Sequence, residues 1–130
     1  PATEMVAGFI GEGIVLPAED IVADGAGRAQ ARIHGAPVTL RCAAGERTRR
    51  RAAIGLHPQD IRLAAANETG LPARIRRLSY RGGSFRAEAV CEAAPETVLA
   101  FDLPEQAPLA PGAAVSLAIG DGWVIPALAA

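Results

Sequence analysis

Apolar and polar residues alternate along much of the chain, and the clearest alternation begins near residue 29. Two successive runs place an apolar side chain at every second position, and these side chains belong to Ala29, Ala31, Ile33, Val38, Leu40 and Cys42. A period of two is typical of a strand with one buried face. A turn at Gly35–Ala36 sets Ile33 opposite Val38, which predicts a hairpin with one wholly apolar face.

A second hairpin is predicted around the turn at Gly82–Gly83, which pairs Tyr80 with Phe85. In this register both rings face the core. The alternation fails at the adjacent arginines of Arg76–Arg77, and one extra residue at that point restores it. The pattern therefore predicts a β-bulge there, with Glu88 beside it and within reach of an arginine.

The remaining pattern predicts an all-β fold, a small barrel or sandwich of short antiparallel strands with a short N-terminal helix. The apolar runs 115–119 and 123–125 flank the turn 120–122 and predict a third hairpin. Thr3 can cap a helix that runs to about Ile10. Three polar or proline-rich segments read as loops: 47–51, 64–70 and 104–111.

Composition narrows the classes of protein that the pattern allows. A chain of 130 residues is the size of one compact domain, and with only five aromatic residues its core must consist mainly of small and branched aliphatic side chains. The net charge of -1 argues against a nucleic-acid or anionic-membrane binder. No apolar run approaches the length of a bilayer-spanning helix, so the chain is expected to be soluble and intracellular.

The residues that carry chemistry do not form a catalytic or metal-binding pattern. All thirteen basic residues are arginine, so the lysine that reaches the phosphates in an ATPase phosphate loop is absent, and no G-x-S-x-G nucleophile turn occurs. His34 and His57 lie outside any short-spaced ligand cluster and are interpreted as structural or exposed. Cys42 and Cys91 are interpreted as reduced, buried thiols, and Asp60 as the cap of a local turn. We expect no catalytic residue, cofactor or metal in this chain.

Four segments, in order along the chain, resemble the transport-associated OB (TOBE) domain of ABC-importer ATPases. The opening Pro1–Glu12 is similar to P-x-x-x-x-V-A-x-F-I-G-E, with which these ATPases leave the nucleotide-binding domain, and Gly55–Leu63 resembles V-R-P-E-D-I-R-L. Tyr80–Phe85 resembles the Y-L-G-x-x-x hairpin, and Gly122–Trp123 a late strand. His57 and Gln59 stand where the family usually has arginine and glutamate. The motif residues are His57, Pro58, Gln59 and Asp60.

The resemblance implies a fold, a context and a partner. Residues 1–12 would be a linker helix from a nucleotide-binding domain, and residues 13–130 an OB-like regulatory domain. The parent would be the ATP-binding subunit of a bacterial import system for ferric ion, polyamines or sugars. The opening segment most resembles the ATPases of ferric-ion importers. ATP and Mg would bind only in the parent, which would form a homodimer and contact membrane permease subunits at the cytoplasmic face of the cell membrane. In some relatives the domain also takes regulatory proteins or small ligands.

The sequence disfavours two other classes of OB-like domain and leaves the role of Trp123 open. An oxyanion-binding domain would carry a S-A-R-N-like segment, which is absent. A nucleic-acid-binding OB domain could use the rings and arginines of 80–86, but the charge balance disfavours it. The isolated domain is expected to dimerise, and the candidate interface residues are Leu117, Ile119, Trp123 and Ile125. Trp123 either anchors that interface or plugs the end of the barrel.

Overall fold

The structure is a computed structural model that describes residues 13–107 and 109–126. The predicted N-terminal helix and the linker of residues 1–12 lie outside the described residues. The described part is almost entirely β-structure, which confirms the all-β prediction. In chain order its elements are β1 (Ile14–Ala23), β2 (Arg28–Ile33), β3 (Ala36–Arg41), β4 (Arg49–Leu56), the 3-10 helix η1 (Pro58–Asp60), β5 (Ile61–Leu63), β6 (Leu71–Tyr80), β7 (Ser84–Cys91), β8 (Ala94–Pro104), β9 (Ala114–Ile119) and β10 (Trp123–Val124).

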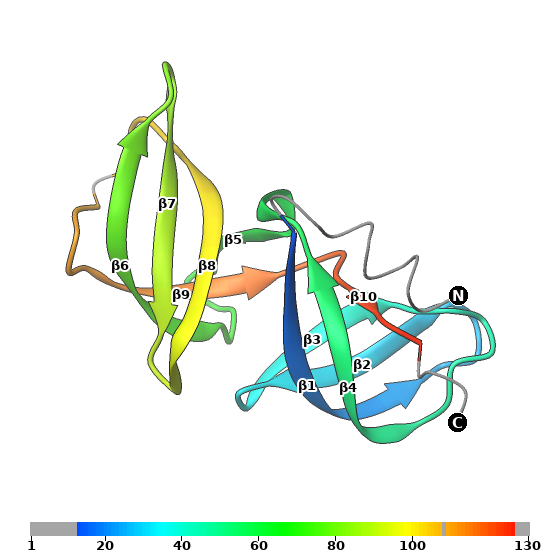
Figure 1. Cartoon of the computed structure of the whole chain (residues 1–130). Helices are drawn as coiled ribbons and strands as arrows, with labels where there is room; N and C mark the ends of the chain where they lie inside the picture. The colour runs from blue at the N-terminus through cyan, green and yellow to red at the C-terminus, as the bar shows by residue number, and fades with distance from the viewer. Residues whose placement is uncertain (1–12, 108, 127–130) are drawn as a thin grey trace.

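The strands form two bodies that lie side by side (Figure 1). The first is a closed barrel with the order β1-β2-β3-β10-β4, and the second is a five-stranded sheet with the order β5-β9-β6-β7-β8. The chain passes from barrel to sheet through η1 after β4, and it returns from β9 to β10 across the residues 120–122. The predicted small OB-like barrel is therefore present, and a second sheet is attached to it.

The β2–β3 hairpin has the predicted apolar face but a different register. Ile33 pairs with Ala36 and Ala31 with Val38, so each residue is displaced by two positions from the predicted partner. The turn lies at His34 and Gly35, whose φ angles are 48° and 85°. Two residues with positive φ suit a tight hairpin turn. Because a shift of two preserves the side-chain alternation, the same residues still point inward.

The β6–β7 hairpin confirms the predicted bulge. Its register shifts between Ile75 and Arg77, and Tyr80 pairs with Phe85 as expected. Arg76 Nη2 donates to Glu88 Oε1 at 2.7 Å. The prediction that both rings face the core was wrong for Tyr80, which is 59% exposed. Its ring packs edge-on against Phe85, with 5.3 Å between the ring centroids, and its hydroxyl donates to Glu105 Oε1 at 3.1 Å.

The predicted third hairpin was wrong. β9 pairs with β5 and β6 in the second sheet, whereas β10 pairs with β3 and β4 in the barrel. The segment 120–122 therefore spans two bodies and is not a turn. Gly122 packs so closely that a Cβ built there would lie 2.6 Å from Leu56 Cδ2 and 2.8 Å from Leu40 Cδ2. The predicted loop 47–51 was also partly wrong, because β4 already begins at Arg49 and pairs with β1.

One continuous core joins the barrel to the sheet. Its buried members come from β1, β2, β3, β4 and β10 as well as from the second sheet, and they pack as a single cluster. Most are alanine, leucine, isoleucine or valine, and Phe101 is the largest fully buried side chain among the described residues. Cys42 and Cys91 are both buried and free, and burial raises the pKa of each thiol. A shared core makes independent movement of the two bodies costly.

Candidate functional site

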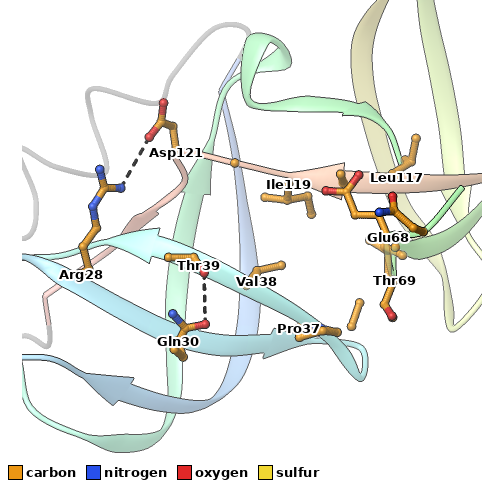
Figure 2. Close-up of a pocket in the computed structure, with 16 residues that line it drawn as sticks. Arg28, Gln30, Pro37, Val38, Thr39, Glu68, Thr69, Leu117, Ile119 and Asp121 are labelled. Atoms are coloured by element: carbon orange, nitrogen blue, oxygen red, sulfur yellow. Dashed lines mark hydrogen bonds and ion pairs between the residues drawn. The ribbon is translucent and has the colours of Figure 1, made fainter. Parts of the chain in front are cut away.

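A depression in the described surface lies between the barrel and the second sheet. It has a volume of about 580 Å³ and is lined by β2, β3, the loop before β6, β9 and the segment that leads to β10 (Figure 2). Its floor is apolar, because Pro37, Val38 and Ile119 all line it. We call this depression the inter-sheet groove.

Polar side chains of the barrel form one rim of the inter-sheet groove. On the outer face, Thr39 Oγ1 donates to Gln30 Oε1 across the β2–β3 pair at 3.1 Å. Nearer β10, Arg28 Nη1 lies 3.7 Å from Asp121 Oδ1, with both side chains largely exposed. An exposed pair at this distance contributes little to stability. The rim is therefore polar, with one arginine close to one carboxylate.

The loop between β5 and β6 forms the other rim, and Glu68 holds it in shape. Arg62 donates to both carboxylate oxygens of Glu68, at 2.8 and 2.7 Å, and the amide of Ala65 donates to Glu68 Oε1 at 2.8 Å. These hydrogen bonds, first of all the one from Arg62, lower the pKa of Glu68 to about 2. The predicted loop 64–70 is confirmed, and its carboxylate is committed to Arg62 and to the backbone.

The motif residues His57, Pro58, Gln59 and Asp60 form the junction by which the chain enters the second sheet. The amide of His57 donates to Asp60 Oδ2 at 2.8 Å, which confirms Asp60 as the cap of a local turn. The carbonyl oxygen of Asp60 accepts a hydrogen bond from Gly120 N, also at 2.8 Å. The motif thus links the two segments in which the chain crosses between the barrel and the second sheet. Within the described residues its role is structural.

Trp123 lies where β10 closes the barrel. Its ring stands under the guanidinium of Arg41, whose carbon is 5.7 Å from the ring centroid, and Arg41 Nη2 donates to the carbonyl oxygen of Asp121 at 2.9 Å. The indole ring is half-buried, and its Nε1 is buried without a hydrogen-bond partner among the described residues. Asp121, whose carbonyl oxygen accepts from Arg41, also lines the inter-sheet groove.

The other candidate interface residues lie in the core. Leu117, Ile119 and Ile125 are 1%, 9% and 6% exposed. Their side chains pack within the chain, because β9 is central in its sheet and Ile125 follows the strand that closes the barrel. Of the four candidates, only Trp123 offers side-chain surface to a partner. Whether a second copy binds there stays a prediction.

Other sequence candidates are dispersed. His34 occupies the β2–β3 turn and His57 precedes η1, and no group of three or more histidine, cysteine, aspartate or glutamate residues that could hold a metal occurs within the described ranges. In the same ranges no helix has the length and apolar character that crossing a membrane requires. The groove residues Arg28, Gln30 and Thr39 were not recognised from the sequence, since they are the ordinary polar positions of alternating strands.

A closed five-stranded barrel, fused by a shared core to a second antiparallel sheet, defines a small all-β domain of the OB-like kind. The chain belongs to the TOBE domain family, which matches residues 54–125. The match runs from β4 to the end of β10 and so contains the motif junction, the whole second sheet and the return to the barrel. No curated protein matches the chain. Membership of this family suggests a role as an accessory domain of ABC transporter ATPases.

Proposed function

We propose that this chain is the C-terminal accessory domain of the ATP-binding subunit of a bacterial ABC import system, where it assists subunit dimerisation and regulates transport. The observation that carries the proposal is the TOBE match over residues 54–125. The opening segment supports the same context, because it resembles the way importer ATPases leave the nucleotide-binding domain. That opening most resembles ferric-ion importers, so ferric ion is the proposed cargo.

The architecture suits a part that holds two subunits together. The two bodies share one core, and the chain passes between them twice. A unit of this kind resists deformation, because closely packed protein interiors have low compressibility. The proposed partners are a second copy of the subunit and, through the parent, the permease subunits at the cytoplasmic face of the membrane. ATP and Mg would bind in the parent, and no nucleic acid is proposed as a partner.

The charges of the inter-sheet groove do not favour the oxyanion-binding alternative. Arg28 is the cation among the residues that line it, and two carboxylates, Glu68 and Asp121, line it as well. An anion entering the groove would meet both carboxylates and would have to compete with Asp121 for Arg28. The accessory role is therefore the function we propose.

The proposal has two direct tests. The gene region upstream of Pro1 should encode a G-x-x-x-x-G-K-[ST] loop, because the lysine of that loop binds the phosphates in ATPases. A native start codon at Pro1 would contradict the proposal. In the second test, calorimetric titration of the 130-residue chain with Mg-ATP should give no heat above dilution, whereas micromolar binding would contradict the division of labour between this domain and the parent.

A further inference from the structure

The barrel carries an apolar patch on the outer side of β1, β4 and β10, which are neighbouring strands in its closed order (Figure 1). Val15 and Trp123 both pair with Gly55. In the next outward row, Pro17 pairs with Ala53. Paired residues lie on the same face of a sheet, and each of these five is followed in sequence by a core residue, which points inward. The outward-facing set, which we call the outer patch, is therefore Val15, Pro17, Ala53, Gly55 and Trp123.

The outer patch is suited to a close-packed cover. Its middle strand, β4, offers only Gly55 and Ala53, so another element can approach the backbone there. Val15 beside them is 46% exposed, which is unusual for a large apolar side chain in this structure. Trp123 Nε1 is buried and has no hydrogen-bond partner among the described residues, whereas buried donors in folded proteins are almost always paired. A cover for this patch should therefore bring apolar side chains and one hydrogen-bond acceptor.

Residues 1–12 lead directly to the outer patch, because Val15 is the second residue of β1. They lie outside the described residues, but their sequence predicts a helix over 3–10. A helix this short is not stable alone in water, so it depends on a surface that buries its apolar face. That face would carry only apolar side chains, those of Met5, Val6, Phe9 and Ile10.

The dimensions of this segment fit the outer patch. A helix over residues 3–10 would be about 12 Å long, and β1 rises about 13 Å from Val15 to Glu19. The link from Ile10 to Ile14 can span up to about 14 Å, which exceeds the spacing of about 10 Å between packed layers. Glycines at positions 11 and 13 of this link permit the chain to reverse. A helix that folds back from β1 would therefore lie along the patch and end near Val15.

We propose that residues 1–12 dock on the outer patch through the apolar face of the helix. Phe9 and Ile10 would cover Trp123, which pairs in the same row as Val15. The carbonyl groups in the last turn of a helix have no partner within it. In this placement they lie near Trp123 and can accept the hydrogen bond from its Nε1. The segment thus supplies both the apolar cover and the acceptor that the outer patch calls for.

In the proposed parent, residues 1–12 would link this domain to the nucleotide-binding domain. A docked link is stiff, because close-packed side chains resist deformation. Movement of the nucleotide-binding domain would then turn the barrel with it. This consequence rests on the proposed function, whereas the docking itself concerns only this chain. Docking and pairing with a second copy compete for Trp123, since both would cover the same ring.

The 130-residue chain tests the docking directly, because Trp123 is its one tryptophan. In the wild-type chain we expect NMR cross-relaxation between the indole protons of Trp123 and the side chain of Phe9 or Ile10. The signal should be the same at low and high protein concentration, because the contact lies within one chain. This measurement needs no substitution.

Two variants and a matched control test the same contact by fluorescence. Phe9→Ser should lower the ratio of docked to free segment at least about tenfold, because it removes a buried ring. Acrylamide should then quench Trp123 more strongly than in the wild-type chain. Ala53→Gln, at an exposed position of the outer patch, should have the same effect from the barrel side. Ala7→Ser adds the same hydroxyl as Phe9→Ser outside the apolar face and should leave quenching unchanged. The amide NMR spectrum of the strands reports whether each variant keeps the barrel folded.

Three results would overturn the proposal. They are absence of cross-relaxation between residues 1–12 and the outer patch, equal quenching in Phe9→Ser and Ala7→Ser, and cover of Trp123 that appears only as the protein concentration rises. The last result would assign the outer patch to a second copy of this chain. Failure of the transporter context would leave these outcomes unchanged, because the measurements concern only this chain.

Discussion

The amide of Gly120 donates a 2.8 Å hydrogen bond to the carbonyl oxygen of Asp60, across the point where the chain passes between barrel and sheet. Asp60 ends the passage out of the barrel, and Gly120 begins the passage back. This bond fixes two segments that lie 60 positions apart in the sequence. The family motif is therefore placed where it can hold the two bodies in one arrangement, and four predictions follow from this arrangement and its surroundings.

Replacing Asp60 should loosen this junction. Its carboxylate is 10% exposed and accepts from the amide of His57. We expect Asp60→Ala to lower the free energy of unfolding by about 1 to 2 kcal/mol, because that amide loses its acceptor. Asp60→Asn keeps an acceptor oxygen and should lose less. Urea denaturation followed by Trp123 fluorescence measures both, and equal losses would show that the hydrogen bond does not stabilise the junction.

Gly122 should tolerate a methyl group less well than Gly120, which lies two positions earlier in the chain. A Cβ at Gly122 would collide with Leu56 and Leu40, so Gly122→Ala should destabilise the fold by about 1 to 3 kcal/mol. At Gly120 a Cβ meets no atom within 4 Å, and Gly120→Ala should change stability by less than about 0.5 kcal/mol. Thermal unfolding of the two variants checks this contrast. A similar melting temperature for both would contradict the close packing at Gly122.

The loop between β5 and β6, which Glu68 holds in shape, should be less stable at low pH. The pKa of Glu68 is lowered from 4.5 to about 2 in the folded chain, first by the hydrogen bond from Arg62. A carboxyl with a depressed folded pKa stabilises the fold above pH 4.5, and this contribution is lost as the pH falls from about 4.5 to 2. Because the pair is exposed, we expect a small effect that salt reduces. Carbon-13 NMR titration should place the Glu68 pKa near 2, and Arg62→Met should return it toward 4.5.

Replacing Trp123 should show whether its ring anchors a dimer interface or plugs the end of the barrel. Light scattering over a concentration series should show a dimer at hundreds of micromolar, as we expect for a domain that pairs in its parent. Trp123→Ala should abolish the dimer and leave the fold intact if the ring is an interface anchor, and should unfold the chain if it plugs the barrel. Tyr80→Ala is the control, since Tyr80 is exposed in the other body. A strictly monomeric wild-type mass would refute the dimer.

Features set by neighbouring residues were predictable from the sequence. The bulge at Arg76–Arg77 follows from a local break in alternation, and a single extra residue explains it. The cap at Asp60 likewise involves residues three positions apart. The β2–β3 register differs from the prediction because the turn was assigned to Gly35–Ala36, whereas His34 and Gly35 adopt positive φ and place the turn one residue earlier. Alternation alone does not detect a shift of two.

Features set by distant residues were not predictable from the pattern. Apolar runs on both sides of 120–122 look the same whether the chain turns back or crosses to another sheet. The crossing depends on tertiary packing, such as the close approach of Gly122 to Leu56 and Leu40. The groove depends on which edges of β3 and β9 remain unpaired, and that depends on where β6 begins and how short β10 is. Sequence spacing does not record such tertiary pairings.

The late position of β10 affects how the barrel is made during synthesis. β1, β2, β3 and β4 leave the ribosome before β10, and the strand between β3 and β4 comes from residues 123–124, after the whole second sheet. Loop closure over such a separation is slow, because many residues must be ordered before the contact forms. During this interval the nascent barrel has a gap between β3 and β4, and the apolar interior near Leu40 and Leu56 is open there.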